Sequence, residues 1–260
     1  MKTSKVIAGL LPCISLLSAA WVLAANDVED KLTKSFEAKP GGILVVEADR
    51  GSIEVKSADA NQVEIEVFRK VSRESQAKAE EILKNHEVRF SLDGNKVQVH
   101  AEFKKGFTGG WGDKGRNLQV RYQILVPKQF NVNLKTAGGS IKVADLIGEA
   151  RGQTAGGSLS FGQMDGPIYG RTSGGGISVA GCKGGVDLET SGGSIHVALA
   201  EKVAVDVDAK TSGGRVVTEV PVTAVAQGEH KPNALRGKIN GGGPALSLET
   251  SGGSIYLRKR

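Results

Sequence analysis

A glycine pair that returns at a short, fixed interval constrains the fold of this chain more than any other feature. A threonine opens each copy, and the regular copies begin at Thr136, Thr154, Thr172 and Thr190. Degenerate copies begin at Thr211 and Ile239, and a clean copy begins at Thr250. A short fixed period is typical of one supersecondary unit stacked on itself. The repeat therefore predicts a solenoid.

The glycine pair is interpreted as a tight corner between two short strands. Such a corner needs a positive φ or a close backbone approach, and glycine tolerates both. The predicted corner residues are Gly138, Gly139, Gly156, Gly157, Gly174, Gly175, Gly192, Gly193, Gly252 and Gly253. Gly148, Gly166 and Gly184 mark a second corner. On this interpretation Gly174→Val destabilises the fold, and the threonines form a ladder of hydroxyl groups.

Apolar and polar residues alternate after each glycine pair. When each threonine is counted as position one, position six contains Ile141, Leu159, Ile177 and Ile195, and position eight contains Val143, Phe161, Val179 and Val197. Stacking coils about 4.8 Å apart aligns each column and buries it. The pattern predicts an all-β, single-stranded, β-helix-like solenoid with rungs of about 18 residues. Cys182 falls in the apolar column at position eleven and is predicted to be buried.

The first 25 residues are interpreted as an export signal. Lys2 and Lys5 precede an apolar run that ends in Ala24 and Ala25, where cleavage is expected. The alternative is an uncleaved membrane anchor, because the run is nearly long enough to span a bilayer. Without the two lysines, 32 basic residues face 28 acidic residues, a net charge of +4. Cys182 is then the remaining cysteine, so an intramolecular disulfide is excluded.

The rest divides into two parts by composition, since 26 of the 36 glycines lie from Gly138 onward. Residues 26–135 are predicted to be rich in strands, with an amphipathic helix at about 74–86 and a loop rich in glycine and lysine at 104–116. Residues 136–260 are predicted to form the solenoid, with an excursion at about 219–233. The first part is expected to shield one end of the stack, and Arg258–Arg260 to supply charge at the other.

The sequence motifs favour a protein that is not an enzyme. The four histidines have no metal-ligand spacing, so no metal and no cofactor are expected. The outward columns mix charges, as in Gln153, Arg171, Glu189 and Lys210, and Asp145, Asp165 and Asp187 share no column. A polysaccharide-active enzyme would need two acids in one cleft. The mild charge, with no basic arm or helix, excludes nucleic acid as a partner.

The order of these motifs resembles the bacterial putative adhesin domain family, a domain of unknown function. The likeness rests on the segments 124–128 and 132–141, on the early motif 51–55, and on the motifs 238–244 and 250–255. It covers essentially the whole chain after the signal. The resemblance implies an exported β-solenoid of the periplasm or cell surface of a Gram-negative-type bacterium, and it carries over no catalytic residue.

Binding residues are predicted mainly on loops, because loops on rigid scaffolds usually carry recognition. The candidates are Phe107, Trp111, Lys142, His196 and His230. The predicted partner is an envelope polymer or protein, and membrane association is expected only if the signal stays uncleaved. The favoured function is an adhesion or scaffold module. The alternatives are an envelope-stress or signalling partner and the polysaccharide-active enzyme, and the oligomeric state is open.

Overall fold

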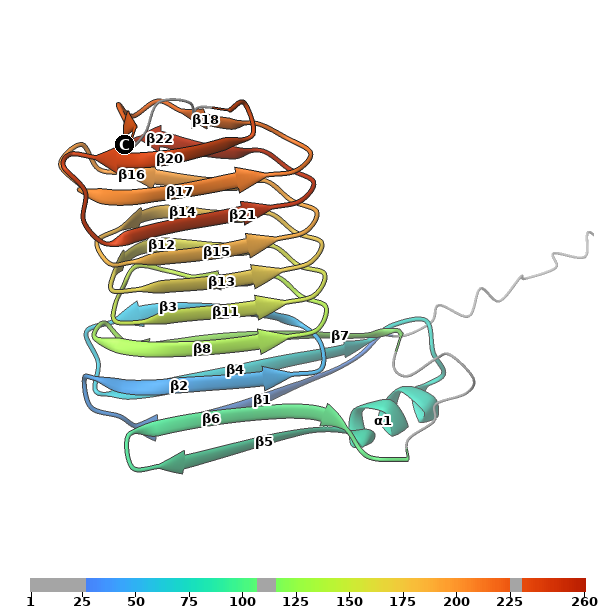
Figure 1. The fold of residues 1–260 in the computed structure, drawn as a ribbon. Helices are drawn as coiled ribbons and strands as arrows, with labels where there is room; N and C mark the ends of the chain where they lie inside the picture. Colours follow the sequence, from blue (N-terminus) through green and yellow to red (C-terminus); the bar gives the residue numbers. More distant parts are fainter. Residues whose placement is uncertain (1–26, 107–115, 225–230) are drawn as a thin grey trace, which may run out of the picture.

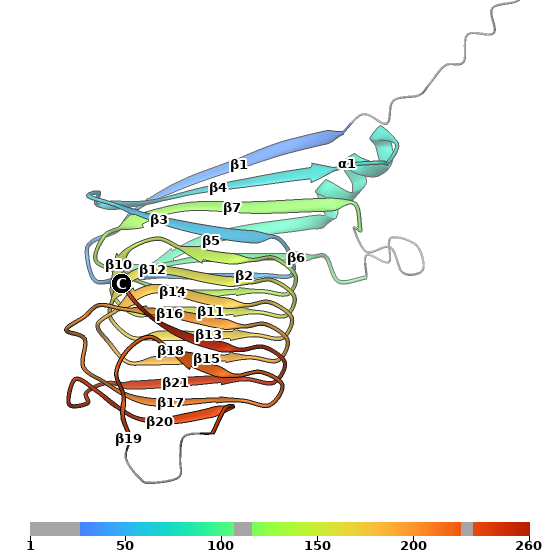
Figure 2. The ribbon, with the colours of Figure 1, turned by 90° about the horizontal axis from the view of Figure 1, so that it is seen from above.

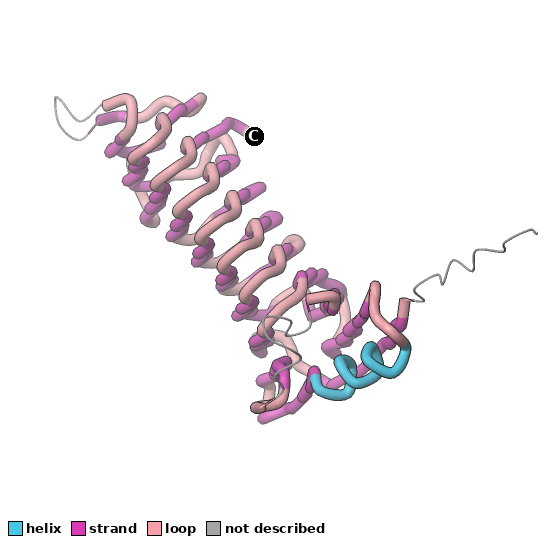
Figure 3. Tube along the Cα trace, turned by 90° about the vertical axis from the view of Figure 1, so that its right-hand side faces the viewer, coloured by secondary structure: helices cyan, strands magenta, loops and turns pink. Residues whose placement is uncertain are grey.

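The computed structural model describes residues 27–106, 116–224 and 231–260. This part of the chain is mostly β-structure, with one helix, α1 (Gln76–Asn85). Between residues 118 and 218 successive strands alternate between two sheets, apart from the short strand at 146–147, and the coils stack along one axis (Figures 1 and 3). The predicted all-β, solenoid-like class with one helix is confirmed. The predicted signal segment and Phe107, Trp111 and His230 lie outside the described residues.

In the described residues, sheet A contains ten strands along its path, with β10 (Leu146–Ile147) paired to β12 off the path. In spatial order these strands are β1 (Val28–Glu37), β4 (Gln62–Val71), β7 (Leu118–Pro127), β3 (Ser52–Ala58), β9 (Ile141–Val143), β12 (Leu159–Asp165), β14 (Ile177–Cys182), β16 (Ile195–Leu199), β22 (Ile255–Lys259) and β18 (Val216–Thr218). Figure 2 shows this layer running from β1 to the short β18.

Sheet B faces it and contains eleven strands of the described chain. In spatial order these are β19 (Thr223–Ala224), β20 (Ala234–Ile239), β17 (Val205–Thr211), β21 (Ala245–Thr250), β15 (Val186–Thr190), β13 (Ile168–Thr172), β11 (Ala150–Thr154), β8 (Phe130–Thr136), β2 (Gly42–Ala48), β6 (Lys96–Phe103) and β5 (His86–Asp93). Pairing is parallel through the middle of both sheets and antiparallel at both ends of sheet B and at the β1 end of sheet A, whereas β18 at the other end of sheet A pairs in parallel with β22.

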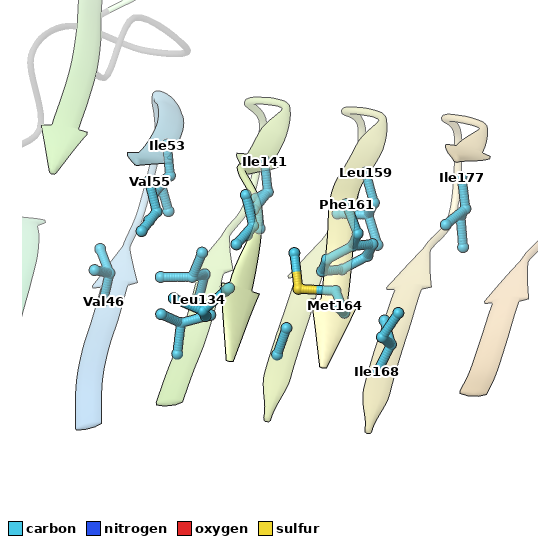
Figure 4. Packing of buried hydrophobic residues seen from close by; sticks show 14 of the residues in the cluster. Val46, Ile53, Val55, Leu134, Ile141, Leu159, Phe161, Met164, Ile168 and Ile177 are labelled. Carbon is cyan, nitrogen blue, oxygen red and sulfur yellow. The ribbon is translucent and has the colours of Figure 1, made fainter. Parts of the chain in front are cut away.

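The core consists of aliphatic columns between the sheets. Ile141 pairs with Leu159, Leu159 with Ile177, and Ile177 with Ile195, and each of these side chains is at most 1% exposed. Figure 4 shows the labelled members of this column stacked on one another, with Ile53 continuing it. Burying one such side chain contributes about 1.5–3 kcal/mol. The predicted inward columns are therefore present, and Cys182 lies buried in the column at position eleven.

The second glycine of each pair is the one that the corner requires. None of the predicted pairs has a positive φ. A Cβ added to Gly175 would lie 2.1 Å from the Gly157 carbonyl oxygen of the preceding coil, whereas one added to Gly174 meets nothing closer than 3.4 Å. The same close approach recurs at Gly139, Gly157, Gly193 and Gly253. Close stacking of the backbones, rather than a left-handed conformation, therefore explains the glycine pair. The position that tolerates no side chain is Gly175, and not Gly174 as the sequence suggested.

The threonine that opens each copy joins its own corner to the preceding coil. The Thr172 hydroxyl donates to the Gly157 carbonyl at 2.7 Å and accepts from the Gly175 backbone N–H at 3.4 Å. Equivalent bonds to the adjacent coil are made by Thr136, Thr154, Thr190, Thr211 and Thr250. All six threonines are buried. The hydroxyl groups therefore bond to backbone carbonyls, not to one another as the sequence suggested.

The sheets continue without a break across residue 136. Strand β2 pairs with β8, and β3 pairs with β9, so the first coil is built by residues before the glycine-rich repeat. Gly51 takes the place of the second corner glycine there, since its carbonyl lies beneath Gly139. The division into parts of residues 26–135 and 136–260 stays a prediction.

Strands, rather than the helix, extend the N-terminal end of the stack. Strands β4 and β1 continue sheet A, and β6 and β5 continue sheet B, while α1 lies beside their ends (Figures 1 and 2). The Ser75 side chain caps α1 by accepting the backbone N–H of Lys78. The buried Arg69 donates to the Leu83 carbonyl at 3.0 Å and pairs with Asp30. This bond fixes the end of the helix to the sheet.

The C-terminal coil is inserted inside the stack. Strand β22 lies between β16 and β18, and β21 lies between β15 and β17, so Thr250 pairs with both Thr190 and Thr211. The prediction that Arg258–Arg260 caps the end was therefore wrong. The segment at Asn240 is a turn of three positive-φ residues, Asn240, Gly241 and Gly242, after the antiparallel β20, and not a degenerate corner.

The two corner glycines should respond differently to the same substitution. Gly175→Ala forces a Cβ against backbone and should lower the free energy of unfolding by about 2 kcal/mol or more. Gly174→Ala has room and should stay within about 1 kcal/mol of the parent. Urea unfolding of both variants measures the difference. Equal effects would contradict the close-approach explanation.

Removing a threonine hydroxyl should cost a buried hydrogen bond. Thr172→Val keeps the shape of the side chain but leaves the Gly157 carbonyl without this donor, and should destabilise by about 1–3 kcal/mol. Thr172→Ser keeps the hydroxyl and should retain most of the stability. Thermal unfolding of the pair measures this, and a Val variant as stable as the Ser variant would show that the hydroxyl contributes nothing.

Candidate binding surface

The outer face of sheet A presents one column of side chains along the stack. Lys142 pairs with Ser160, Ser160 with Ser178, Ser178 with His196, and His196 with Tyr256. These positions alternate with buried aliphatic residues, so their side chains point away from the core. The predicted candidates Lys142 and His196 therefore share a column, but three strand spacings, about 14 Å, separate them.

An aromatic pair forms the most distinctive part of this column. The rings of His196 and Tyr256 stack in parallel, with centroids 4.7 Å apart and an interplanar angle of 6°. Both side chains are half-buried. The Arg258 guanidinium lies over the Tyr256 ring, 5.8 Å from its centroid. We call His196, Tyr256 and Arg258 the aromatic platform. It offers apolar ring surface beside a cation on a sheet whose backbone is rigidly paired.

The electrostatics of the aromatic platform favour a neutral imidazole. Burial, and then the nearby positive charge of Arg258, hold the pKa of His196 below its usual value. The ring is therefore uncharged near neutral pH. Because the lowered pKa belongs to the folded chain, the contribution of His196 to stability is complete above its ordinary pKa of about 6.5 and is lost as the pH falls below it.

Lys142 differs from the aromatic platform because it is already paired. Its ammonium lies 3.5 Å from a Glu54 carboxylate oxygen, and Glu54 also faces Lys56 at 3.9 Å. Lys142 is exposed, so this pair is worth little energetically. Lys142 and His196 therefore lie on the same face of sheet A but are too far apart to contact each other. Of the five predicted binding residues, these two are the ones within the described chain.

Two residues of the aromatic platform, Tyr256 and Arg258, were missed by the sequence analysis. Tyr256 occupies position seven of the last copy, the position that His196 occupies in its own copy. The two lie far apart in sequence, and the inserted coil makes them neighbours. The signal that could have revealed this is the irregular gap between Thr190 and Thr211, which spans two coil heights instead of one.

The inserted coil also changes the charged column on the outer face of sheet B. Glu249 lies between Glu189 and Lys210, so two glutamates that are distant in the sequence are neighbours. Glu189 pairs with Arg171 at 3.1 Å, and Glu249 pairs with Lys210 at 3.1 Å. Each of these two carboxylates is therefore in an ion pair. Among residues 27–106, 116–224 and 231–260, no group of histidine, cysteine and acidic residues could hold a metal ion.

Comparison with known proteins gives similarity in fold only. No family model and no curated protein sequence matches the chain. A solved structure from Clostridium sporogenes, described as a putative cell adhesion protein, is 12% identical and covers 90% of this chain and 100% of its own, with a TM-score of 0.48. A putative adhesin from Bacteroides fragilis is 11% identical and covers 88% of this chain and 97% of its own, with a TM-score of 0.34.

A third structure, a putative adhesin from Parabacteroides distasonis, is 8% identical and covers 89% of this chain and 97% of its own, with a TM-score of 0.31. These three structural neighbours are bacterial proteins described as putative adhesins or cell adhesion proteins, in agreement with the resemblance in sequence. At these identities they assign no ligand and no residue to this chain.

Removing the guanidinium of the aromatic platform should shift the titration of its imidazole. Arg258→Gln removes a positive charge and should raise the pKa of His196, although burial should keep it below the ordinary value. The NMR shifts of the imidazole as a function of pH measure the change. Arg171→Gln, on the other sheet, is the matched control and should leave the titration as in the parent. An unchanged pKa in Arg258→Gln would contradict the assigned geometry.

Proposed function

We propose that this chain is an exported cell-envelope β-solenoid, with one coil for each copy of the threonine and glycine-pair repeat, that binds an envelope polymer or protein without turning it over. The observation that carries the proposal is the aromatic platform. Aromatic rings on a rigid sheet provide contact area at a low cost in conformational entropy, because the side chains are already held in place. The cation beside them adds attraction for anionic groups.

Placement in the envelope rests on the sequence. The apolar segment that precedes residue 26 has the pattern of an export signal. In the described part of the chain, no helix has the length and apolar character needed to cross a membrane. An adhesion or scaffold role in the periplasm or at the cell surface suits a stack of rigid coils, which presents an extended face to a partner.

The hydrogen bonds and ion pairs of the carboxylates do not favour catalysis. Asp145 and Asp165 line one groove, so the sequence criterion of two acids in one cleft is met there. However, Asp145 accepts the Gln163 backbone N–H at 2.8 Å, and Asp165 binds Lys183 at 2.5 Å. Hydrogen bonds from Arg89 and then His100 lower the pKa of Glu102 in a second groove. A general acid needs the opposite shift, because it must hold its proton near neutral pH.

Binding to an insoluble polymer provides the test. The full chain should co-sediment with purified cell-wall polysaccharide, and Tyr256→Ser should weaken binding about two- to tenfold, the usual worth of an aromatic contact. Tyr169→Ser is the matched control, because Tyr169 lies on the outer face of sheet B against Arg151, 3.9 Å from the guanidinium. It should bind as the parent does.

Two outcomes would overturn the proposal. If Tyr256→Ser and Tyr169→Ser reduce binding equally, the aromatic platform is not the contact surface. If soluble fragments of the polymer accumulate with time in the presence of the parent chain, the module is an enzyme. Thermal unfolding of both variants confirms that each is folded.

A further inference from the structure

A groove runs along the edge of the stack where the strands of sheet A end. Its volume is about 460 Å³. Its walls come from successive coils, at Leu146 and Ile147, at Met164, at Cys182 and then at Val203. From the coil of Leu146 to that of Ala200 the groove crosses three coil spacings, about 14 Å. The groove lies at the strand ends, apart from the aromatic platform on the face of the sheet.

The floor of the groove is apolar. Leu146, Met164 and Cys182 form the buried column at position eleven, and each is at most 5% exposed. Burial raises the pKa of the Cys182 thiol to about 11, so the sulfur stays protonated and acts as an apolar surface. Ile147 stands at one end with 48% of its surface exposed, which is unusual for so large an apolar side chain in this structure. That end therefore offers uncovered apolar surface.

Two cations stand at the other end without an anionic partner. Arg260 reaches back from β22 over β14, so that its guanidinium would lie 3.5 Å from a Cβ placed on Gly181. Its backbone N–H donates to the Leu199 carbonyl at 3.0 Å, which fixes its position. Lys202 lines the same end. Within the described residues neither side chain has an ion pair, whereas Lys183 and Lys128, also in the lining, are paired with aspartates.

The side-chain carboxylates of the groove are already engaged. Asp165 binds Lys183, and Asp145 accepts the backbone N–H of Gln163. Asp145 has no cationic partner among the described residues, so the lining holds two unpaired cations and one unpaired carboxylate, a net positive side-chain charge. The two cations lie at one end of the groove, while the uncovered apolar surface lies at the other. A guanidinium is suited to a carboxylate because it donates two parallel hydrogen bonds.

We propose that this groove binds an acidic amphiphile, a single aliphatic chain that ends in a carboxylate. The carboxylate lies between Arg260 and Lys202, and the aliphatic chain follows the apolar floor toward Ile147. A polyanion fits less well, because its charges would extend along the floor, where the other lysines are already neutralised. This site is separate from the aromatic platform, so it does not depend on the function proposed above.

Dodecanoate, below its micelle concentration, is the probe, and calorimetric titration of the full chain is the measurement. Saturable binding of one molecule per chain is expected. Dodecyltrimethylammonium has the same chain with the opposite charge, and acetate has the same head group without the chain, so both should bind at least about tenfold more weakly. Equal binding of dodecyltrimethylammonium would overturn the proposal, because apolar contact alone would then explain it.

Substitutions locate the site. Arg260→Gln and Lys202→Gln should each weaken dodecanoate binding, the first by about tenfold or more, because a charge-assisted bond is lost. Ile147→Ser should weaken it by removing apolar contact at the other end. Lys210→Gln on the outer face of sheet B is the matched control for charge and should bind as the parent does, as should Tyr256→Ser.

The remaining outcomes are also decisive. Unchanged affinity in Arg260→Gln, with thermal stability preserved, would overturn the assignment of the head group. Binding of dextran sulfate in the absence of dodecanoate binding would replace the proposed ligand with a polyanion. Loss of polymer binding in Tyr256→Ser with dodecanoate binding retained would separate this site from the function of the sheet face.

Discussion

The hydrogen bond from a buried threonine to the glycine carbonyl of the preceding coil is the interaction on which this structure depends. It joins each corner to its neighbour at the point where the backbones approach most closely, and only a residue without a side chain fits there. A buried carbonyl without a donor costs about 1–3 kcal/mol, so the threonine and the glycine have to occur together. Their spacing then fixes the register of every aliphatic column behind the corner.

The repeat was enough to predict the architecture, because its physical causes are local. Stacked copies with the same apolar positions can bury those positions only by lying in register, as Ile141, Leu159 and Ile177 do. The distinction between Gly174 and Gly175 could not be predicted, because the two residues differ only in which one faces the coil beneath it. The helix was recognisable from its amphipathic pattern, but its place beside the sheets depends on Arg69, a contact distant in sequence.

The candidate surface was predicted only in part. His196 was found because its position in the repeat points outward, but its partner Tyr256 belongs to a copy that the chain order places two coils later. The same displacement hid the pairing of Glu189 with Glu249 on neighbouring strands. Arg260 was expected to cap the stack and instead faces a groove. Each of these differences has one cause: the order of coils in space departs from the order of copies in the sequence after Thr190.

That departure has a consequence for how the molecule is made. Strands β21 and β22 follow β17, β18 and β20 along the chain, yet they occupy an internal slot between coils synthesised earlier. In coil-by-coil growth from the N-terminus, β17 and β18 therefore have no place in the stack directly after β16, because β21 and β22, which come later in the chain, lie between them and the earlier coils. Strands β21 and β22 connect the earlier coils to the last one. A chain that loses them leaves β17 and β18 without these pairing partners in the two sheets, and does not simply form a shorter stack.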